Sequence, residues 1–284
     1  MTRGLNDERI ASGLLDLGDV PRMADVLHGR IEHLNRIEAE HRREHHCLTQ
    51  RLFDEARPAG LRTYIHAFQG IKTAWENYSA VFGLLQGPHG ATPIAPYNLV
   101  RLAFEAAFYA LWALEPEDGS ERCLRGLRLA VEDNRQRSGW IEELIKIPEL
   151  TEAERQHMRE PVAKANNVYQ REAEAIRVNW PKQVKQKLNV EQAIPKLQHI
   201  VDLADPLILH TTVAAWRQLS GYQHGHVYAL VGGSDLSREF EIPGGALVRV
   251  TMRDQDFTLA MQHAALMQLW AVETYIARTT MQSP

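Results

Sequence analysis

The chain has 284 residues, of which 44% are hydrophobic and 24% charged, and its formal net charge is −4. These values are those of a globular protein with a sizeable core, and they exclude a chain that is disordered throughout. The net negative charge argues against a protein that coats nucleic acid non-specifically, and it leaves room for an enzyme that contacts RNA at one small basic pocket. Two cysteines, Cys47 and Cys123, are too few for a disulfide framework or a four-cysteine zinc site.

Residues 21–56 are predicted to form one long helix. Val20, Leu27 and Leu34 are seven residues apart, and a helix with this heptad spacing packs its apolar residues along one seam. Pro58 lies just beyond the predicted end, where a residue without a backbone N–H stops a helix. The seam predicts that this helix packs on the rest of the chain or projects from it, and it favours a homodimer.

Two further helices are predicted over residues 61–86 and 97–114, joined by a loop rich in glycine and proline. The second is apolar on nearly every face, which is typical of a helix at the centre of a domain. The next two helices, over 121–147 and 151–178, carry many charged residues. The latter opens with a Thr-Glu-Ala-Glu sequence, a near match to a capping box, and it is expected to face solvent or a partner.

Three arginines, Arg122, Arg125 and Arg128, recur every three residues along the predicted helix over 121–147. A basic stripe of this kind fits a contact with RNA or phosphate. Because acidic residues are interspersed along the same helix, a solvated helix face also accounts for it.

The C-terminal third is predicted to contain an apolar helix over 207–231, a β-hairpin within 238–253 and an amphipathic helix over 256–280. Alternating apolar residues on both sides of a Pro-Gly-Gly turn indicate the hairpin. The fold predicted for the whole chain is therefore all-α, a helical bundle with a long N-terminal helix and one small β-hairpin near the C-terminus. Because we find neither a signal-peptide core nor an apolar run long enough to span a bilayer, we expect a cytoplasmic protein without membrane partners.

Arg217 and His224 are the residues most suggestive of chemistry. They are seven positions apart on an apolar helix, so they lie about 20° apart around its axis, and His210 extends the same stripe by another seven. A guanidinium can hold a phosphate and stabilise the charge that it gains in a reaction. An imidazole can accept or donate a proton near neutral pH. The stripe therefore predicts a site for phosphate chemistry.

This Arg-x6-His pattern, on a late helix of an all-helical chain, resembles the motif of the HEPN superfamily, in which a histidine follows an arginine after four to six residues. Many members have a small polar residue after the arginine, where this chain has Gln218. The resemblance implies an N-terminal helical or coiled-coil segment over 1–58 and a HEPN-like helical domain over 59–284. A variable helical insertion would occupy about 120–192 of that domain.

The function that the resemblance implies is metal-independent RNA cleavage, without a cofactor, with Arg217 and His224 as the catalytic residues. Glu105 is implied as an acidic residue on an earlier helix that orients them, and Arg101 and His210 as further supporting residues. Many members of the superfamily are homodimers whose motif helices meet at the interface. Many act as toxins or in anti-phage defence, so RNA is the substrate that we expect.

Two other functions remain open. Arg217 and His224 could be interior polar residues, and Arg101 and Glu105 could be an intrahelical ion pair. The chain would then be a non-catalytic binding or assembly protein that contacts a protein partner through its N-terminal helix. The third hypothesis is a helical metalloprotein, because Glu38, His41 and His45 share one helix face at a spacing that suits a metal ion.

Overall fold

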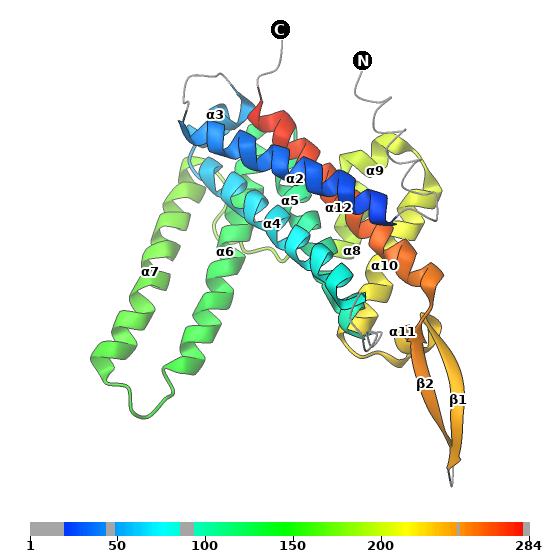
Figure 1. Cartoon of the computed structure of the whole chain (residues 1–284). Helices are drawn as coiled ribbons and strands as arrows, with labels where there is room; N and C mark the ends of the chain where they lie inside the picture. Colours follow the sequence, from blue (N-terminus) through cyan, green and yellow to red (C-terminus); the bar gives the residue numbers. More distant parts are fainter. Residues whose placement is uncertain (1–19, 44–48, 86–93, 243–244, 281–284) are drawn as a thin grey trace.

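The computed structural model describes residues 20–43, 49–85, 94–242 and 245–280. It is an all-α bundle with one small antiparallel hairpin near the C-terminus, as the sequence predicts (Figure 1). The elements are α2 (Val20–Arg43), α3 (Gln50–Glu55), α4 (Gly60–Leu85), α5 (Ile94–Leu114), α6 (Gly119–Leu144), α7 (Glu152–Ala175), α8 (Val190–Ala193), the 3₁₀ turn η1 (Ile194–Lys196), α9 (Gln198–Leu203), α10 (Pro206–Gln223), α11 (Val227–Gly232), β1 (Ser234–Ile242), β2 (Gly245–Met252) and α12 (Asp254–Thr279).

The centre of the bundle is α5, which packs against α4 on one side and α12 on the other, while α10 covers a further face. Its burial confirms that the helix predicted over 97–114 lies inside the domain. Helix α12 is buried around most of its circumference as well. The prediction that the last helix is amphipathic is therefore wrong. Polar residues give it a half-polar sequence, and the structure buries six of them: Gln262, His263, Gln268, Thr274, Arg278 and Thr279.

The N-terminal helix is shorter than predicted. Helix α2 ends at Arg43, and α3 is a separate helix that begins after Thr49, whose side-chain oxygen accepts a hydrogen bond from the backbone N–H of Leu52 (3.3 Å). The heptad seam does not face a second chain, because Leu27 and Leu34 belong to the core that α4, α5 and α12 share. Helix α2 therefore lies across the bundle, along α12 (Figure 1).

Helices α6 and α7 form an antiparallel arm that extends away from the bundle (Figure 1). The predicted capping box is present, since the Thr151 side chain accepts from the backbone of Glu154 and the Glu154 side chain accepts from the backbone of Thr151. Most of α7 is exposed, and Pro161 lies inside it without ending the helix. The arm is the part of the chain that we assigned to a helical insertion at about 120–192.

One buried ion pair and its hydrogen bonds tie α3, α4 and α6 together. The carboxylate of Asp54 accepts two hydrogen bonds from Arg122 (2.7 and 2.8 Å) and one from the Tyr64 hydroxyl (2.7 Å). The Asp54 and Arg122 side chains are fully buried. A buried charge is tolerated only when it is paired and hydrogen-bonded in this way. Arg122 therefore holds helices together in the interior and is not part of an exposed basic stripe.

The β-hairpin begins earlier than predicted, at Ser234, which pairs with Met252, and its register shifts at a bulge between Arg238 and Phe240. It projects from the end of the bundle opposite to the α6–α7 arm (Figure 1). Among the residues that the structure describes, no helix combines the length and apolarity that crossing a bilayer requires.

Candidate active site at the end of α10

The helix that carries Arg217 and His224 is interrupted, where the sequence predicted a continuous helix over 207–231. Helix α10 ends at Gln223, and Gly225 adopts a left-handed φ of 65°. The N–H of His226 donates to the carbonyl of Gly221 (2.9 Å) and the N–H of Gly225 to that of Tyr222 (3.1 Å), which is a Schellman motif. The signal for this end was visible in the sequence, because glycine is the usual residue at such a position.

Arg217 and His224 are both exposed to solvent. The Arg217 side chain is 63% exposed and forms an ion pair with Glu191 of α8, and this hydrogen-bonded carboxylate raises its pKa. His224 occupies the C-terminal cap of α10, two turns further on. Seven residues correspond to about 10 Å along a helix axis, so a bound phosphate would have to lie between them.

The turn after α10 adds two rings that the sequence analysis did not assign to the site. Because Gly225 reverses the chain, the ring of His226 lies 5.9 Å from that of His224, and the ring of Tyr228 lies 5.8 Å from that of His226. The Tyr228 hydroxyl donates to the carbonyl of Arg217 (3.2 Å). His224, His226 and Tyr228 therefore form an exposed row of rings, called the ring row below.

Small residues hold the ring row against α10. A Cβ at Gly221 would lie 2.7 Å from the Tyr228 hydroxyl and 2.7 Å from the Cβ of Ala229. Such contacts are shorter than atoms tolerate, so only glycine lets α11 approach this closely. The geometry of the ring row thus depends on Gly221 as well as on Gly225.

Arg101 and Glu105 lie beneath α10 and contact each other rather than Arg217 or His224. Glu105 accepts from Arg101 (2.5 Å) and from the Tyr109 hydroxyl (3.4 Å). The buried Arg101 guanidinium packs on the ring of Trp216, 4.9 Å from its centroid. Arg101 therefore contacts α10 through Trp216, the residue before Arg217 in the chain. Glu105 pairs with Arg101 within α5.

Two buried polar atoms along this seam between α5 and α10 have no hydrogen-bond partner within the described part of the chain. They are Nε of Arg101 and Nε1 of Trp216. A buried donor or acceptor without a partner is costly, and water or a ligand usually satisfies it. The seam therefore offers two donors, one of them on Trp216, the residue before Arg217 in the chain.

His210 lies outside this group. It is exposed near the beginning of α10, fourteen residues before His224, or about 20 Å along the helix axis. The structure therefore does not bring His210 together with His224.

The residues of the metal hypothesis have other partners. Glu38 is buried and accepts from Arg51 and from the Tyr275 hydroxyl (2.7 Å), and His41 is 3.2 Å from the carboxylate of Glu55. His45 lies outside the described residues. Within the described ranges, no three histidine, cysteine or acidic side chains form a group that could hold a metal ion.

Comparisons with protein families, with curated proteins and with solved structures found no match for this chain.

Proposed function

We propose that the chain is a metal-independent endoribonuclease of HEPN type and that its reaction centre is the turn between α10 and α11. The observation that carries the proposal is the pair of exposed imidazoles, His224 and His226, whose rings are 5.9 Å apart. Cleavage through a neighbouring hydroxyl needs one group that accepts a proton and another that donates one. Two imidazoles on opposite sides of a phosphate provide both near neutral pH.

In the proposed reaction, the ribose 2′-oxygen attacks the adjacent phosphorus. One imidazole accepts the proton of the 2′-hydroxyl, and the other donates a proton to the 5′-oxygen that leaves. The P–O2′ bond forms and the P–O5′ bond breaks, so the products carry a 2′,3′-cyclic phosphate and a 5′-hydroxyl. Arg217 stabilises the additional negative charge on the phosphorane. To do so it must leave Glu191, and solvent screening makes an exposed ion pair of this kind easy to open.

A homodimer is part of this proposal, as the resemblance implies. Around Tyr228 of the ring row, which is 62% exposed, α11 also exposes Val227 (72%) and Val231 (51%). An apolar group of this kind on a short helix is typical of a surface that another chain covers. Light scattering on the purified protein tests the dimer, and Val231→Glu is expected to shift it toward the monomer. A wild-type mass of one chain would contradict this part of the proposal.

The experiment that tests the activity is RNA cleavage in EDTA by the wild type and by His224→Ala, His226→Ala and Arg217→Ala. His157→Ala is the matched control, because His157 is exposed on α7, far from the ring row. We expect the cleavage rate of each of the three variants to fall at least 100-fold, because each one lacks an acid–base group or a donor that stabilises charge. The control is expected to cleave like the wild type, and the wild-type products to carry cyclic phosphate.

Glu191→Gln separates a catalytic Arg217 from a structural one. If Arg217 acts on the phosphate, removal of its competing carboxylate is expected to raise the cleavage rate or leave it unchanged.

Cleavage that persists in His224→Ala and His226→Ala would show that the activity resides elsewhere. Absence of cleavage by the wild type on any pool of total RNA would contradict the ribonuclease proposal.

The second candidate function is a non-catalytic binding or assembly protein. The observation that favours it is the Arg217–Glu191 ion pair, which gives Arg217 a structural partner between α10 and α8. The apolar seam of α2 is buried in its own bundle, so a protein partner would contact the polar outer face of this helix. This function predicts that Arg217→Ala and His224→Ala bind the partner normally, whereas substitutions on the outer face of α2 weaken binding.

A further inference from the structure

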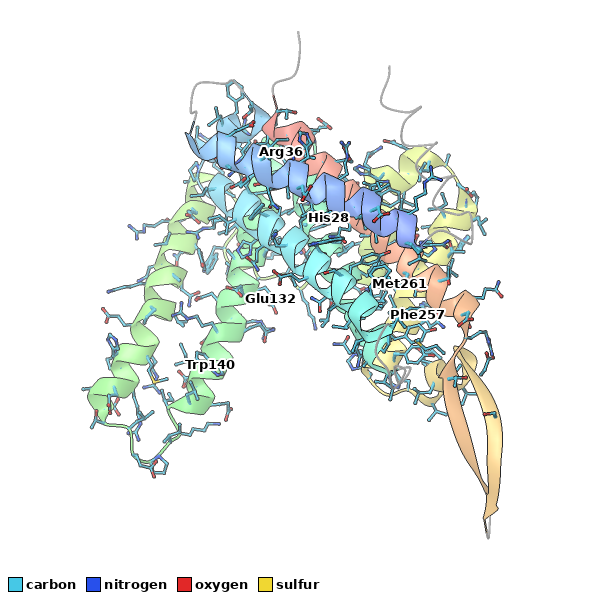
Figure 2. All side chains as sticks on the ribbon, viewed as in Figure 1. His28, Arg36, Glu132, Trp140, Phe257 and Met261 are labelled. Carbon is cyan, nitrogen blue, oxygen red and sulfur yellow. The ribbon has the colours of Figure 1, made fainter. Side chains whose placement is uncertain are left out.

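A cavity lies at the other end of the bundle, where the α6–α7 arm leaves it. It is half open, has a volume of about 570 Å³, and is lined by α4, α5, α6, Asn166 of α7 and the segment 184–188. Its volume falls in the range of about 300–1,000 Å³ that is typical of small-molecule pockets. Figure 2 shows Glu132, one of the lining residues, about midway along α6, with Trp140 further along the arm.

Arg128 is the residue that distinguishes this cavity. The other arginines of the α6 stripe have carboxylate partners, Asp54 for Arg122 and Glu121 for Arg125. Arg128 is half-buried and donates to the carbonyl of Gln186 (2.9 Å), and its Nε is buried without a hydrogen-bond partner. Among the described residues, no carboxylate forms an ion pair with it. Burial lowers the pKa of Arg128, because removal from water disfavours the charged form of the guanidinium.

Aromatic rings lie next to this cation. The guanidinium of Arg128 is 5.1 Å from the centroid of the buried Trp112 ring, and Arg125 packs on the same ring at 4.9 Å. Tyr109 also lines the cavity, together with aliphatic side chains from α5, α6 and the segment 184–188. A flat apolar body could pack against these side chains while its charged group meets Arg128.

The remaining charges favour an anionic ligand. Arg135, Lys185 and Lys187 line the cavity together with Glu132 and Asp133, and Glu132 is bound by Arg135. Burial lowers the pKa of His66, which is therefore neutral near pH 7, while Asp133 acts in the opposite direction. With Arg128, the lining holds four basic and two acidic side chains, so it attracts an anion. The volume of the cavity limits that anion to a small molecule.

We propose that this cavity binds a small organic anion, in which a single phosphate or carboxylate pairs with Arg128 and a flat ring packs against Tyr109 and Trp112. The shared chemistry is one anionic group on an aromatic body, and a nucleoside monophosphate or an aromatic carboxylate would provide it. The site is separate from the ring row, so it stands independently of the ribonuclease proposal.

The test is titration calorimetry on the full chain with four probes: adenosine 5′-monophosphate, uridine 5′-monophosphate, indole-3-carboxylate and inorganic phosphate. We expect one of the three aromatic probes to bind with one-to-one stoichiometry, and inorganic phosphate to bind at least tenfold more weakly. The preference between nucleotides and indole-3-carboxylate identifies the source of the anion. Failure of all three aromatic probes to bind at millimolar concentration would overturn the proposal.

Two variants assign the binding to this cavity. Arg128→Gln removes the charge and is expected to weaken binding at least tenfold, whereas Arg137→Gln, at an exposed position on the same helix, is expected to bind like the wild type. Thr73→Phe fills the cavity from α4 and is expected to abolish binding with Arg128 in place. Binding that survives both Arg128→Gln and Thr73→Phe would overturn the proposal.

The stability of the unliganded protein distinguishes a ligand site from a structural role. Since Arg128 lacks a carboxylate partner, Arg128→Gln is expected to leave the melting temperature unchanged or to raise it. A bound aromatic probe is expected to raise the melting temperature of the wild type and not that of Arg128→Gln. A large loss of stability in unliganded Arg128→Gln, or tighter binding of a short RNA than of either mononucleotide, would contradict the proposal.

Discussion

Two regions of this molecule use the same side-chain types in opposite ways. At the junction of α3, α4 and α6, Arg122, Asp54 and Tyr64 form a closed set of buried hydrogen bonds. At the turn after α10, Arg217 and His224 are exposed, and the ion pair that Arg217 forms with Glu191 is open to solvent. Charged residues stabilise a fold when burial makes their pairing obligatory, and they are free to act on a ligand when they are exposed.

The largest effect is expected from the buried pair. Arg122→Met leaves the Asp54 carboxylate buried without its main partner, and the cost of breaking such a pair is about 3–5 kcal/mol of unfolding free energy. Chemical denaturation measures it. The double variant Asp54→Leu/Arg122→Met, which removes both charges, is expected to be more stable than Arg122→Met. A single variant within 1 kcal/mol of the wild type would show that the junction tolerates an unpaired carboxylate.

A buried histidine predicts how stability depends on pH. His263 on α12 is 2% exposed, and burial lowers its pKa to about 4. The Thr212 hydroxyl donates to the carbonyl of Ile208 (2.6 Å), so it accepts from Nδ1 of His263 (3.0 Å), and the ring is neutral. Because the unfolded chain binds a proton near pH 6.5 and the folded one does not, stability is complete above that pH. It falls by about 3 kcal/mol between pH 6.5 and 4.

The measurement is denaturation at pH 7.5, 5.5 and 4.5 for the wild type and for His263→Gln. The difference between the two proteins isolates this residue from the other titrating groups. The variant is expected to lose the part of the pH dependence that His263 contributes. The same slope in both proteins would mean that His263 is protonated in the folded state.

Two glycines on α6 allow the packing of the junction to be compared with that of the arm: Gly126 lies against α4, and Gly139 lies on the arm. A Cβ at Gly126 would lie 2.3 Å from Oγ1 and 2.7 Å from Cα of Thr63, so Gly126→Ala forces α4 and α6 apart. We expect it to destabilise the fold by about 1–3 kcal/mol. Gly139 has nothing within 4 Å of such a Cβ, so Gly139→Ala is expected to stabilise the helix by up to about 1 kcal/mol. Equal effects of the two substitutions on thermal melting would contradict the close packing at Gly126.

Gly221→Ala applies the same reasoning to the ring row. The added methyl group would push against Tyr228 and Ala229 and displace α11 without removing any functional group. We expect a loss of about 1–2 kcal/mol in stability and a fall in RNA cleavage larger than the unfolded fraction explains. The ratio of cleavage rate to folded fraction, from circular dichroism at the assay temperature, provides the comparison. A normal ratio would mean that cleavage does not depend on the position of α11.

The smallest effect on stability is expected where the effect on activity is largest. His224→Ala and Arg217→Ala alter exposed residues, and such changes usually remain within about 0.5 kcal/mol. Denaturation midpoints close to that of the wild type, together with lost cleavage, would show that the turn serves activity, whereas the buried junction serves stability. A loss above 2 kcal/mol would show instead that these residues support the fold.

Sequence patterns predicted most of the helices, because an apolar stripe at helical spacing and residues such as Pro58 and Thr151 act locally. They also predicted the hairpin within a few residues. They failed where local signals conflict. The helix over 207–231 was predicted as continuous although Gly225 lies inside it, and α12 was predicted as amphipathic because its buried polar residues resemble a surface face.

The sequence by itself determined the all-α class, the buried central helix and the stripe that holds Arg217 and His224, since these follow from periodicity along one segment. The tertiary structure decided which charges are buried, because that depends on neighbours distant in the chain. It paired Arg122 with Asp54 and left Arg128 without a carboxylate, although the three arginines of the stripe look alike in the sequence. It also placed His226 beside His224, through the left-handed turn at Gly225.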